Sequence, residues 1–242
     1  MKGLIFSLLA CVSLVAVPAH AEDRRDYSLQ YRDGNPTFVA SDTVAARRFW
    51  DFVRCVVDRD PKGVDRLLSH FGRGKDMRDE IGHFARRKSV CLSKPHARES
   101  PALSMGTIMF VGSVGGLRVA RQYVDKPKPD HSSVPVIFTA EIVANGETVE
   151  ERKRLVLHAF DECVVRSAPD SVFALLQTSY LSAEETQAFA SLNEIMGHCL
   201  PKKEGESVEL NRFTLRSGLS YAAMALEGEA AKMGLSVQGK PQ

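Results

Sequence analysis

The sequence predicts an all-α or mostly α fold, built from two tandem, similar helical units of about four helices each. Residues 52–94 align with residues 160–202 without a gap, and 11 of the 43 aligned positions are identical. The identical residues are mostly apolar residues, cysteine and proline, which are the types that fix a fold. Apolar residues also recur at helical spacing in both units. Together these observations predict an internal duplication.

The first unit, residues 41–125, contains four predicted helices. The first helix follows the start signal Ser41-Asp42 and presents one apolar face, made of Phe49, Val53, Val56 and Val57. A short second helix is expected to begin at Pro61. Proline is favoured in the first turn of a helix, because the N–H group that it lacks would have no partner there. The third helix is expected from about residue 75 to 92, and the fourth from about 106 to 124.

The second unit, residues 149–228, repeats this plan. Its long first helix is expected over residues 150–166, and Pro169 opens the short second one. Ser182 is the expected start of the third helix, and Glu185 three residues later completes a capping box. The fourth helix is expected over residues 211–229.

Three further segments surround the two units: an N-terminal arm over 22–40, a linker or strand over 126–148 and a tail over 229–242. Residues 134–147 are rich in β-branched residues and end in the turn signal Asn145-Gly146. They could form a hairpin or one strand. Residues 27–40 are the candidate partner, so a small two-stranded sheet beside the helices is the alternative to a purely helical fold.

The first 21 residues are typical of a secretory signal peptide. Lys2 gives a positive start, an apolar run covers residues 4–17, and the cleavage signal "AHA" ends at Ala21. The run is shorter than the roughly 20 residues of a membrane-spanning helix. Cleavage after Ala21 predicts a periplasmic or secreted chain with no later transmembrane segment. Lipid anchoring at Cys11, suggested by the lipobox-like "LLAC", is less favoured because the apolar run continues beyond it.

Four cysteines remain after cleavage, an even number that favours disulfides in an exported protein. Cys55 and Cys91 are 36 positions apart, and so are Cys163 and Cys199. Three pairings are open from the sequence. The duplication favours Cys55–Cys91 and Cys163–Cys199, because a single ancestral unit would have held only its own two cysteines. Metal or redox roles are less favoured, since no C-x-x-C spacing is present.

No catalytic residue, metal ligand or cofactor is predicted. The six histidines after residue 21 lack H-E-x-x-H spacing, and the sequence has no G-x-S-x-G motif. Residues 112–116, GSVGG, are interpreted as close helix packing through small residues. Three carboxylate pairs are interpreted as helix ends and solvated faces: Asp58/Asp60, Asp79/Glu80 and Glu184/Glu185.

A basic run near the third helix is the candidate contact surface for an anion or a partner. Residues 22–126 carry 20 basic and 14 acidic residues, net +6, whereas residues 127–242 carry 11 and 16, net −5. The run could bind anionic lipid or an acidic envelope protein, or could merely complement the helix dipole. Nucleic acid is not an expected partner of an exported chain. The candidate residues are Arg73, Lys75, Arg78, Arg86, Arg87 and Lys88.

The pattern F..CVV...P..V..LL, followed by CL.K and present twice, resembles that of exported bacterial proteins with tandem Cys-Val-Val helical repeats. The resemblance covers roughly residues 49–226. It implies helical repeats and export, and it implies no activity. The expected function is therefore a non-catalytic binding or envelope-associated module. A hydrolase-like enzyme with a cleft between the units is the alternative, and a periplasmic inhibitor or chaperone-like protein is a third hypothesis.

Overall fold

The computed structural model describes residues 43–71, 77–91, 107–127, 129–200 and 211–235. Within these ranges it contains nine α-helices, one 3-10 helix and no strand, so the predicted all-α class is confirmed. The predicted signal peptide, Cys11 and the N-terminal arm all lie outside the described residues.

The first set of helices follows the predicted order. It consists of α1 (Thr43–Arg59), α2 (Pro61–His70), α3 (Met77–Arg87), the 3-10 helix η1 (Ser89–Cys91) and α4 (Thr107–Gln122). Asp60 caps α2, because its carboxylate accepts a hydrogen bond from the Gly63 amide, and Pro61 occupies the first turn as expected. The third helix is shorter than expected, since the chain tightens into a 3-10 turn after α3.

The second set consists of α6 (Val149–Ser167), α7 (Pro169–Gln177), α8 (Ala183–Cys199) and α9 (Arg212–Lys232). Ser182 caps α8 as predicted, and its hydroxyl accepts a hydrogen bond from the Glu185 amide over 3.1 Å. The reciprocal half of the predicted capping box is displaced by one residue. The Glu185 carboxylate accepts from the Leu181 amide instead of the Ser182 amide.

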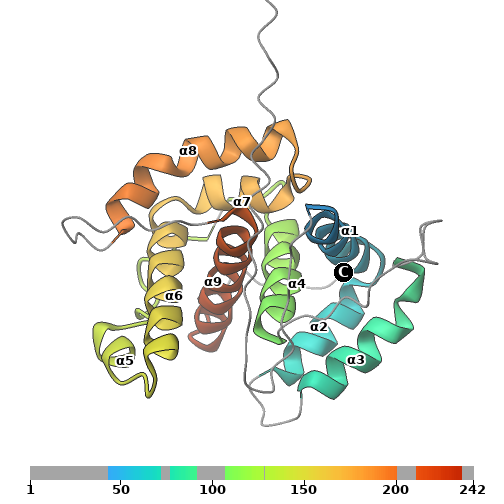
Figure 1. Cartoon of the computed structure of the whole chain (residues 1–242), viewed down its shortest axis with the longest axis horizontal. Helices are drawn as coiled ribbons and strands as arrows, with labels where there is room; N and C mark the ends of the chain where they lie inside the picture. The colour runs from blue at the N-terminus through green and yellow to red at the C-terminus, as the bar shows by residue number, and fades with distance from the viewer. Residues whose placement is uncertain (1–42, 72–76, 92–106, 128, 201–210, 236–242) are drawn as a thin grey trace, which may run out of the picture.

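Equivalent helices make equivalent contacts in the two sets. In the first set, α1 contacts α2, α4 and η1, and α2 contacts α3 and α4. In the second set, α6 contacts α7, α9 and α8, and α7 contacts α8 and α9. Figure 1 shows α1, α2 and α3 on one side of the molecule and α6 on the other, with α4 and α9 between them. This common plan agrees with a tandem duplication, which stays a prediction from the sequence.

Helices α4 and α9 pack directly against each other and join the two sets. Gly112 and Gly116 of α4 lie against the backbone of α9: a Cβ atom at Gly116 would lie 2.3 Å from the Ser220 carbonyl oxygen. Only glycine allows so close an approach of two helix backbones. The interpretation of residues 112–116 as close helix packing is therefore confirmed.

Two apolar cores lie on either side of this contact. One is built on α1, α2, α3 and the first half of α4, and it also takes in Tyr180 and Phe213 from the second set. The other is built on α6 to α9, and it takes in Val119, Ala120 and Tyr123 from the end of α4. Each core thus includes residues from both sets.

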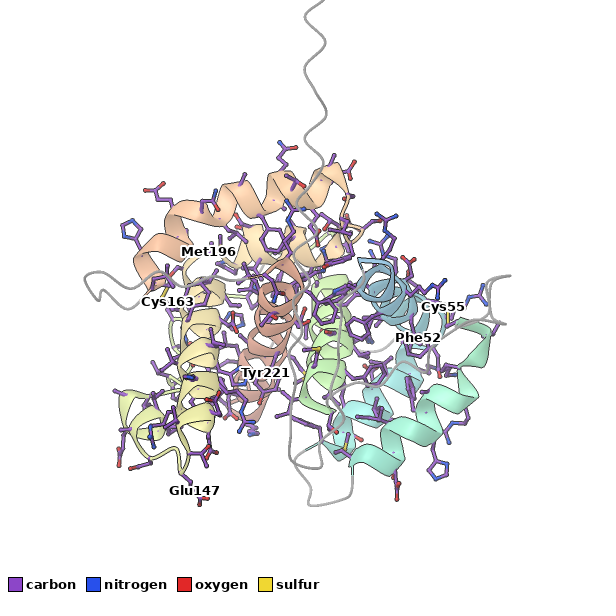
Figure 2. All side chains as sticks on the ribbon, in the orientation of Figure 1. Phe52, Cys55, Glu147, Cys163, Met196 and Tyr221 are labelled. Carbon is purple, nitrogen blue, oxygen red and sulfur yellow. A yellow bond between two sulfur atoms is a disulfide. The ribbon has the colours of Figure 1, made fainter. Side chains whose placement is uncertain are left out.

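Both predicted disulfide pairings are confirmed. Cys55 is bonded to Cys91 and Cys163 to Cys199, with Cα atoms 5.7 Å apart in each pair. Each bond joins the first long helix of its set to the chain at the end of the third helix. Figure 2 marks Cys55 and Cys163 on opposite sides of the molecule. Two such bonds are typical of a periplasmic or extracellular protein.

The segment between the two sets forms turns and a short helix, α5 (Ala140–Ala144). The strand considered for residues 134–147 is therefore wrong, and its candidate partner, residues 27–40, lies outside the described residues. Thr139 caps α5, because its side chain accepts a hydrogen bond from the Ile142 amide.

Two side chains of α6 explain why this segment does not form a strand. Glu162 accepts hydrogen bonds from the Ile137 and Phe138 amides, the latter over 2.9 Å. Arg166 donates to the Val134 carbonyl over 2.9 Å and also pairs with Glu162. Backbone groups that a sheet would need are thus bound to α6 instead.

Candidate functional site

The predicted basic contact surface is described only in part. Arg87 is exposed at the end of α3. The side chains of four other candidates lie outside the described part of the structure: Arg73, Lys75, Arg78 and Arg86.

The sixth candidate, Lys88, is half-buried and paired with an acidic side chain of the protein. Its ammonium nitrogen lies 2.5 Å from Asp60 Oδ2 and 5.9 Å from the centroid of the Phe84 ring. The hydrogen bond from Lys88, together with that from the Gly63 amide, holds the pKa of Asp60 below its ordinary value. Lys88 therefore ties the end of α3 to the start of α2.

A buried ion pair joins α8 to α9. Arg216 Nη1 donates to Glu185 Oε1 over 2.5 Å, and the two residues are 2% and 0% exposed. The interpretation of Glu184/Glu185 as solvated carboxylates is therefore wrong for Glu185. Glu185 lies on the same face of α8 as Phe189 and Leu192, one and two turns later, and that face packs inward.

The same arginine fixes the turn between α7 and α8. Its Nη2 atom donates to the Leu176 and Thr178 carbonyls over 3.0 and 2.8 Å. Arg54 of α1 reaches the same turn and donates to Ser179 Oγ and the Gln177 carbonyl, each over 2.8 Å. The turn is thus held from both sets of helices. We call Arg54, Glu185, Arg216 and residues 176–182 the polar joint.

Aromatic rings cover the polar joint. The guanidinium carbon of Arg216 lies 4.6 Å from the centroid of the Trp50 ring, and Trp50 stacks on Tyr180. Burial lowers the pKa of Arg216, although Glu185 opposes this effect. Burial also raises the pKa of Tyr180 to about 12. The Arg216–Glu185 pair is thus desolvated at the centre of the polar joint, which connects α1 of the first set with α8 and α9 of the second.

A second buried polar group lies between α6 and α9. We call His158, Asp161, Gly218 and Tyr221 the α6–α9 seam. Asp161 is 5% exposed, and a Cβ atom at Gly218 would lie 2.0 Å from Asp161 Oδ2. The His158 ring centroid lies 4.9 Å from that of Tyr221 and 5.1 Å from that of Phe138. Figure 2 marks Tyr221 in the middle of the molecule.

Burial favours the neutral form of every titratable group in the seam. Desolvation raises the pKa of Asp161 well above its ordinary value. It lowers the pKa of His158 to about 4, and Arg154 adds to this lowering. Burial also raises the pKa of Tyr221. The seam therefore carries a neutral imidazole and a neutral phenol at neutral pH, beside a carboxyl group that resists ionisation.

A third buried group joins the end of α4, the segment before α5, and α9. Tyr123 donates its hydroxyl to Glu227 Oε1 over 2.5 Å, and His131 Nε2 lies 4.0 Å from Glu227 Oε2. His131 is 2% exposed, and within the described residues neither of its ring nitrogens has a hydrogen-bond partner. Arg166 donates to the His131 carbonyl, so the backbone is fixed beside this group.

The buried polar groups were missed from the sequence, although a signal for them was present. Several polar residues of the second unit occupy positions at which the first unit has an apolar residue. The residues of three such pairs lie 108 positions apart: Trp50/His158, Val53/Asp161 and Met77/Glu185. In a fourth pair, Val114/Arg216, the residues lie 102 positions apart.

Within the described ranges, no three side chains of histidine, cysteine, aspartate or glutamate lie close enough to hold a metal ion. Likewise, none of the described helices is both long and apolar enough to cross a membrane.

The fold and these groups define a disulfide-bonded, all-α protein with several buried polar contacts. No protein-family model, curated protein or solved structure matches the chain.

Proposed function

We propose that the chain is an exported, non-catalytic binding protein of an oxidising compartment. The main observation in favour of this proposal is that the buried titratable groups of the protein are placed inward. Glu185 is paired with Arg216, and Glu227 accepts the Tyr123 hydroxyl, so these carboxylates stabilise the fold. A substrate in solvent does not reach such groups without opening the protein. Binding through the surface is the function that this arrangement supports best.

Export is supported by the N-terminal sequence and by the two disulfides. Expression of the full chain in a bacterium with a periplasm tests it directly. We expect the periplasmic fraction to contain a protein that begins at Glu22 and holds both disulfides, as read from its intact mass before and after reduction. An uncleaved N-terminus, or a lipid-sized mass increment on Cys11, contradicts this expectation.

The proposed contact surface is the basic end of α3, and the proposed ligand is an anionic lipid head group. Arg87 is exposed there and lies beside Arg86 in the sequence. Lys88 is omitted from the proposed surface because its charge is paired with Asp60. Each basic residue near an anionic membrane surface contributes about 1 kcal/mol of attraction.

Vesicle co-sedimentation tests this surface. We expect the mature protein to bind anionic vesicles better than neutral ones, and the double variant Arg86→Glu/Arg87→Glu to bind them at least about tenfold more weakly. The matched control is Lys153→Glu/Arg154→Glu, which reverses two exposed charges on α6. Equal loss in both variants, or no loss in the first, removes the α3 surface as the contact.

An enzyme is the second candidate, and one observation favours it. His131 and Glu227 approach each other where α4 of the first set meets α9 of the second, as expected for a site between the units, and a substrate would reach them only after these helices open. A panel of ester, peptide and phosphoester substrates tests this candidate. Turnover by the mature protein that is lost in His131→Asn supports it, and no turnover on any substrate leaves binding as the proposed function.

A further inference from the structure

We propose that the α6–α9 seam is a proton-sensitive contact: α6 stays packed on α9 while Asp161 holds a proton, and it loosens when that proton is lost. This inference concerns the second set of helices. It does not depend on the proposed binding surface of α3.

The geometry of Asp161 is the first reason. Its carboxyl group lies in the space that the missing side chain of Gly218 leaves on α9. Within the described part of the chain, neither of its oxygens accepts a hydrogen bond or an ion pair, and burial alone acts on its titration. A protonated carboxyl group is neutral and tolerates such a site, whereas an unpaired carboxylate is strongly disfavoured there.

The arginines of α6 and α9 that could neutralise Asp161 are paired with other groups. Arg166 binds Glu162 and backbone carbonyls before α5, and Arg216 binds Glu185 in the polar joint. Arg154 acts on His158 and Tyr221 and pairs with Glu151 at the surface. A negative charge on Asp161 therefore gains no counter-ion unless the helices move.

The other helices that pack against α6 add no cation to the seam. From α9, the titratable neighbour is Tyr221, whose phenol is kept neutral by burial. Glu185 of α8 is paired with Arg216. The remaining titratable groups of α5, α7 and α8, apart from the bonded Cys199, are exposed: Glu141, Asp170, Glu184, Glu194 and His198.

The direction of the pH effect follows from linkage. The folded protein holds the Asp161 proton to a higher pH than the unfolded chain, whose aspartates titrate near about 4. The contribution of Asp161 to stability is therefore complete below that pH and is lost as the pH rises towards the folded-state pKa. If the folded protein binds one more proton than the unfolded chain, the melting temperature of a protein of this size falls by roughly 3 °C for each unit by which the pH rises.

Thermal unfolding of the mature protein between pH 7 and pH 9, above the range in which His158 titrates, tests the proposal. We expect the wild type to lose melting temperature with rising pH in this range, and Asp161→Asn, which mimics the protonated group, to lose about 3 °C less per pH unit. Asp170→Asn is the matched control, because it removes an exposed aspartate of the same set, and it should behave like the wild type. Equal slopes for the wild type and Asp161→Asn overturn the proposal.

A second measurement tests whether the pH effect arises in α6 and α9. Hydrogen exchange, corrected for the intrinsic effect of pH, should show protection in α6 and α9 falling at pH 9 in the wild type. Asp161→Val, which introduces the residue found at the aligned position Val53 of the first unit, should keep this protection. It replaces Asp161→Asn in the experiment if that variant does not fold. Carbon NMR of the Asp161 carboxyl group gives an independent check. Titration near pH 4, as for an exposed aspartate, also overturns the proposal.

Discussion

At the scale of single residues, Arg216 combines nearly complete burial with four described hydrogen bonds. Its guanidinium bonds Glu185, two carbonyls and the Thr178 hydroxyl, and it lies against Trp50. The charge of Arg216 argues against burial, since arginine is among the residues least often fully buried, and only its alignment with Val114 of the first unit pointed inward. Its role follows from the partners that the fold brings to it.

Removing this arginine should destabilise the protein strongly. Arg216→Ala leaves the Glu185 carboxylate buried and without its cation, so we expect the free energy of unfolding to fall by about 3–5 kcal/mol. Urea denaturation followed by Trp50 fluorescence measures the change. The matched control is Lys232→Ala, which breaks an exposed pair with Glu229 on the same helix and should cost less than about 1 kcal/mol. Similar losses in both variants would contradict a structural role for the polar joint.

His158 predicts a loss of stability in acid. Its pKa is about 4 in the folded protein and 6.5 for the free side chain. The unfolded chain therefore binds a proton that the folded protein does not, and stability falls as the pH drops from about 6.5 to about 4. His158→Leu should reduce this fall, whereas His198→Gln at the surface of α8 should not. Denaturant midpoints between pH 7 and pH 4 measure the difference, and equal pH profiles for all three proteins would refute it.

At the scale of elements, helix α4 is the one on which both cores depend. Its first half belongs to one core and its second half to the other, and its glycines let α9 approach. The sequence predicted this helix from its apolar content and its small residues. It did not predict that α9 would be the helix that packs on those glycines, because the two helices are about 100 positions apart.

A methyl group on α4 tests the close approach. Gly116→Ala places a Cβ atom against the backbone of Ser220, which cannot turn away, so we expect a loss of about 1–3 kcal/mol in unfolding free energy. Gly228→Ala is the matched control in α9, because a Cβ there meets nothing within 4 Å. This control should stabilise the protein by roughly 0.5–1 kcal/mol, since alanine has the higher helix propensity. A neutral effect at Gly116 would mean that α4 and α9 are farther apart.

Helix α5 is an element whose type the sequence pattern did not predict correctly. Its β-branched residues and the Asn145-Gly146 turn are typical of a hairpin. The strand does not form because Glu162 and Arg166 of α6 bind the preceding backbone. Those partners become neighbours only when the chain folds, so local preference is overridden by tertiary contacts.

At the scale of the whole molecule, the two disulfides act on separate halves of the fold. Cys163–Cys199 closes a loop of about 35 residues in the second set, which should contribute about 3–4 kcal/mol by restricting the unfolded chain. We expect the variant Cys163→Ala/Cys199→Ala to lose about that amount while its far-ultraviolet circular dichroism stays helical.

Peptide mapping without reduction is the companion experiment. It should recover Cys55 linked to Cys91 in both the wild type and that variant. Any peptide that links a cysteine of the first set to one of the second would contradict the pairing of cysteines within each set.

The sequence by itself predicted an all-α or mostly α fold, the order of the eight helices of the two units and the close packing at residues 112–116, and it favoured the cysteine pairing that the structure has. These features depend on local periodicity, on proline and capping residues, and on a repeat whose two copies can be compared directly. Only the tertiary structure decided that Glu185 and Arg216 are a buried pair, that Asp161 lies unpaired against Gly218, and that Lys88 is paired with Asp60. The physical reason is that the charge and burial of a side chain are set by its neighbours in space. In this protein, those neighbours come from helices distant in the chain.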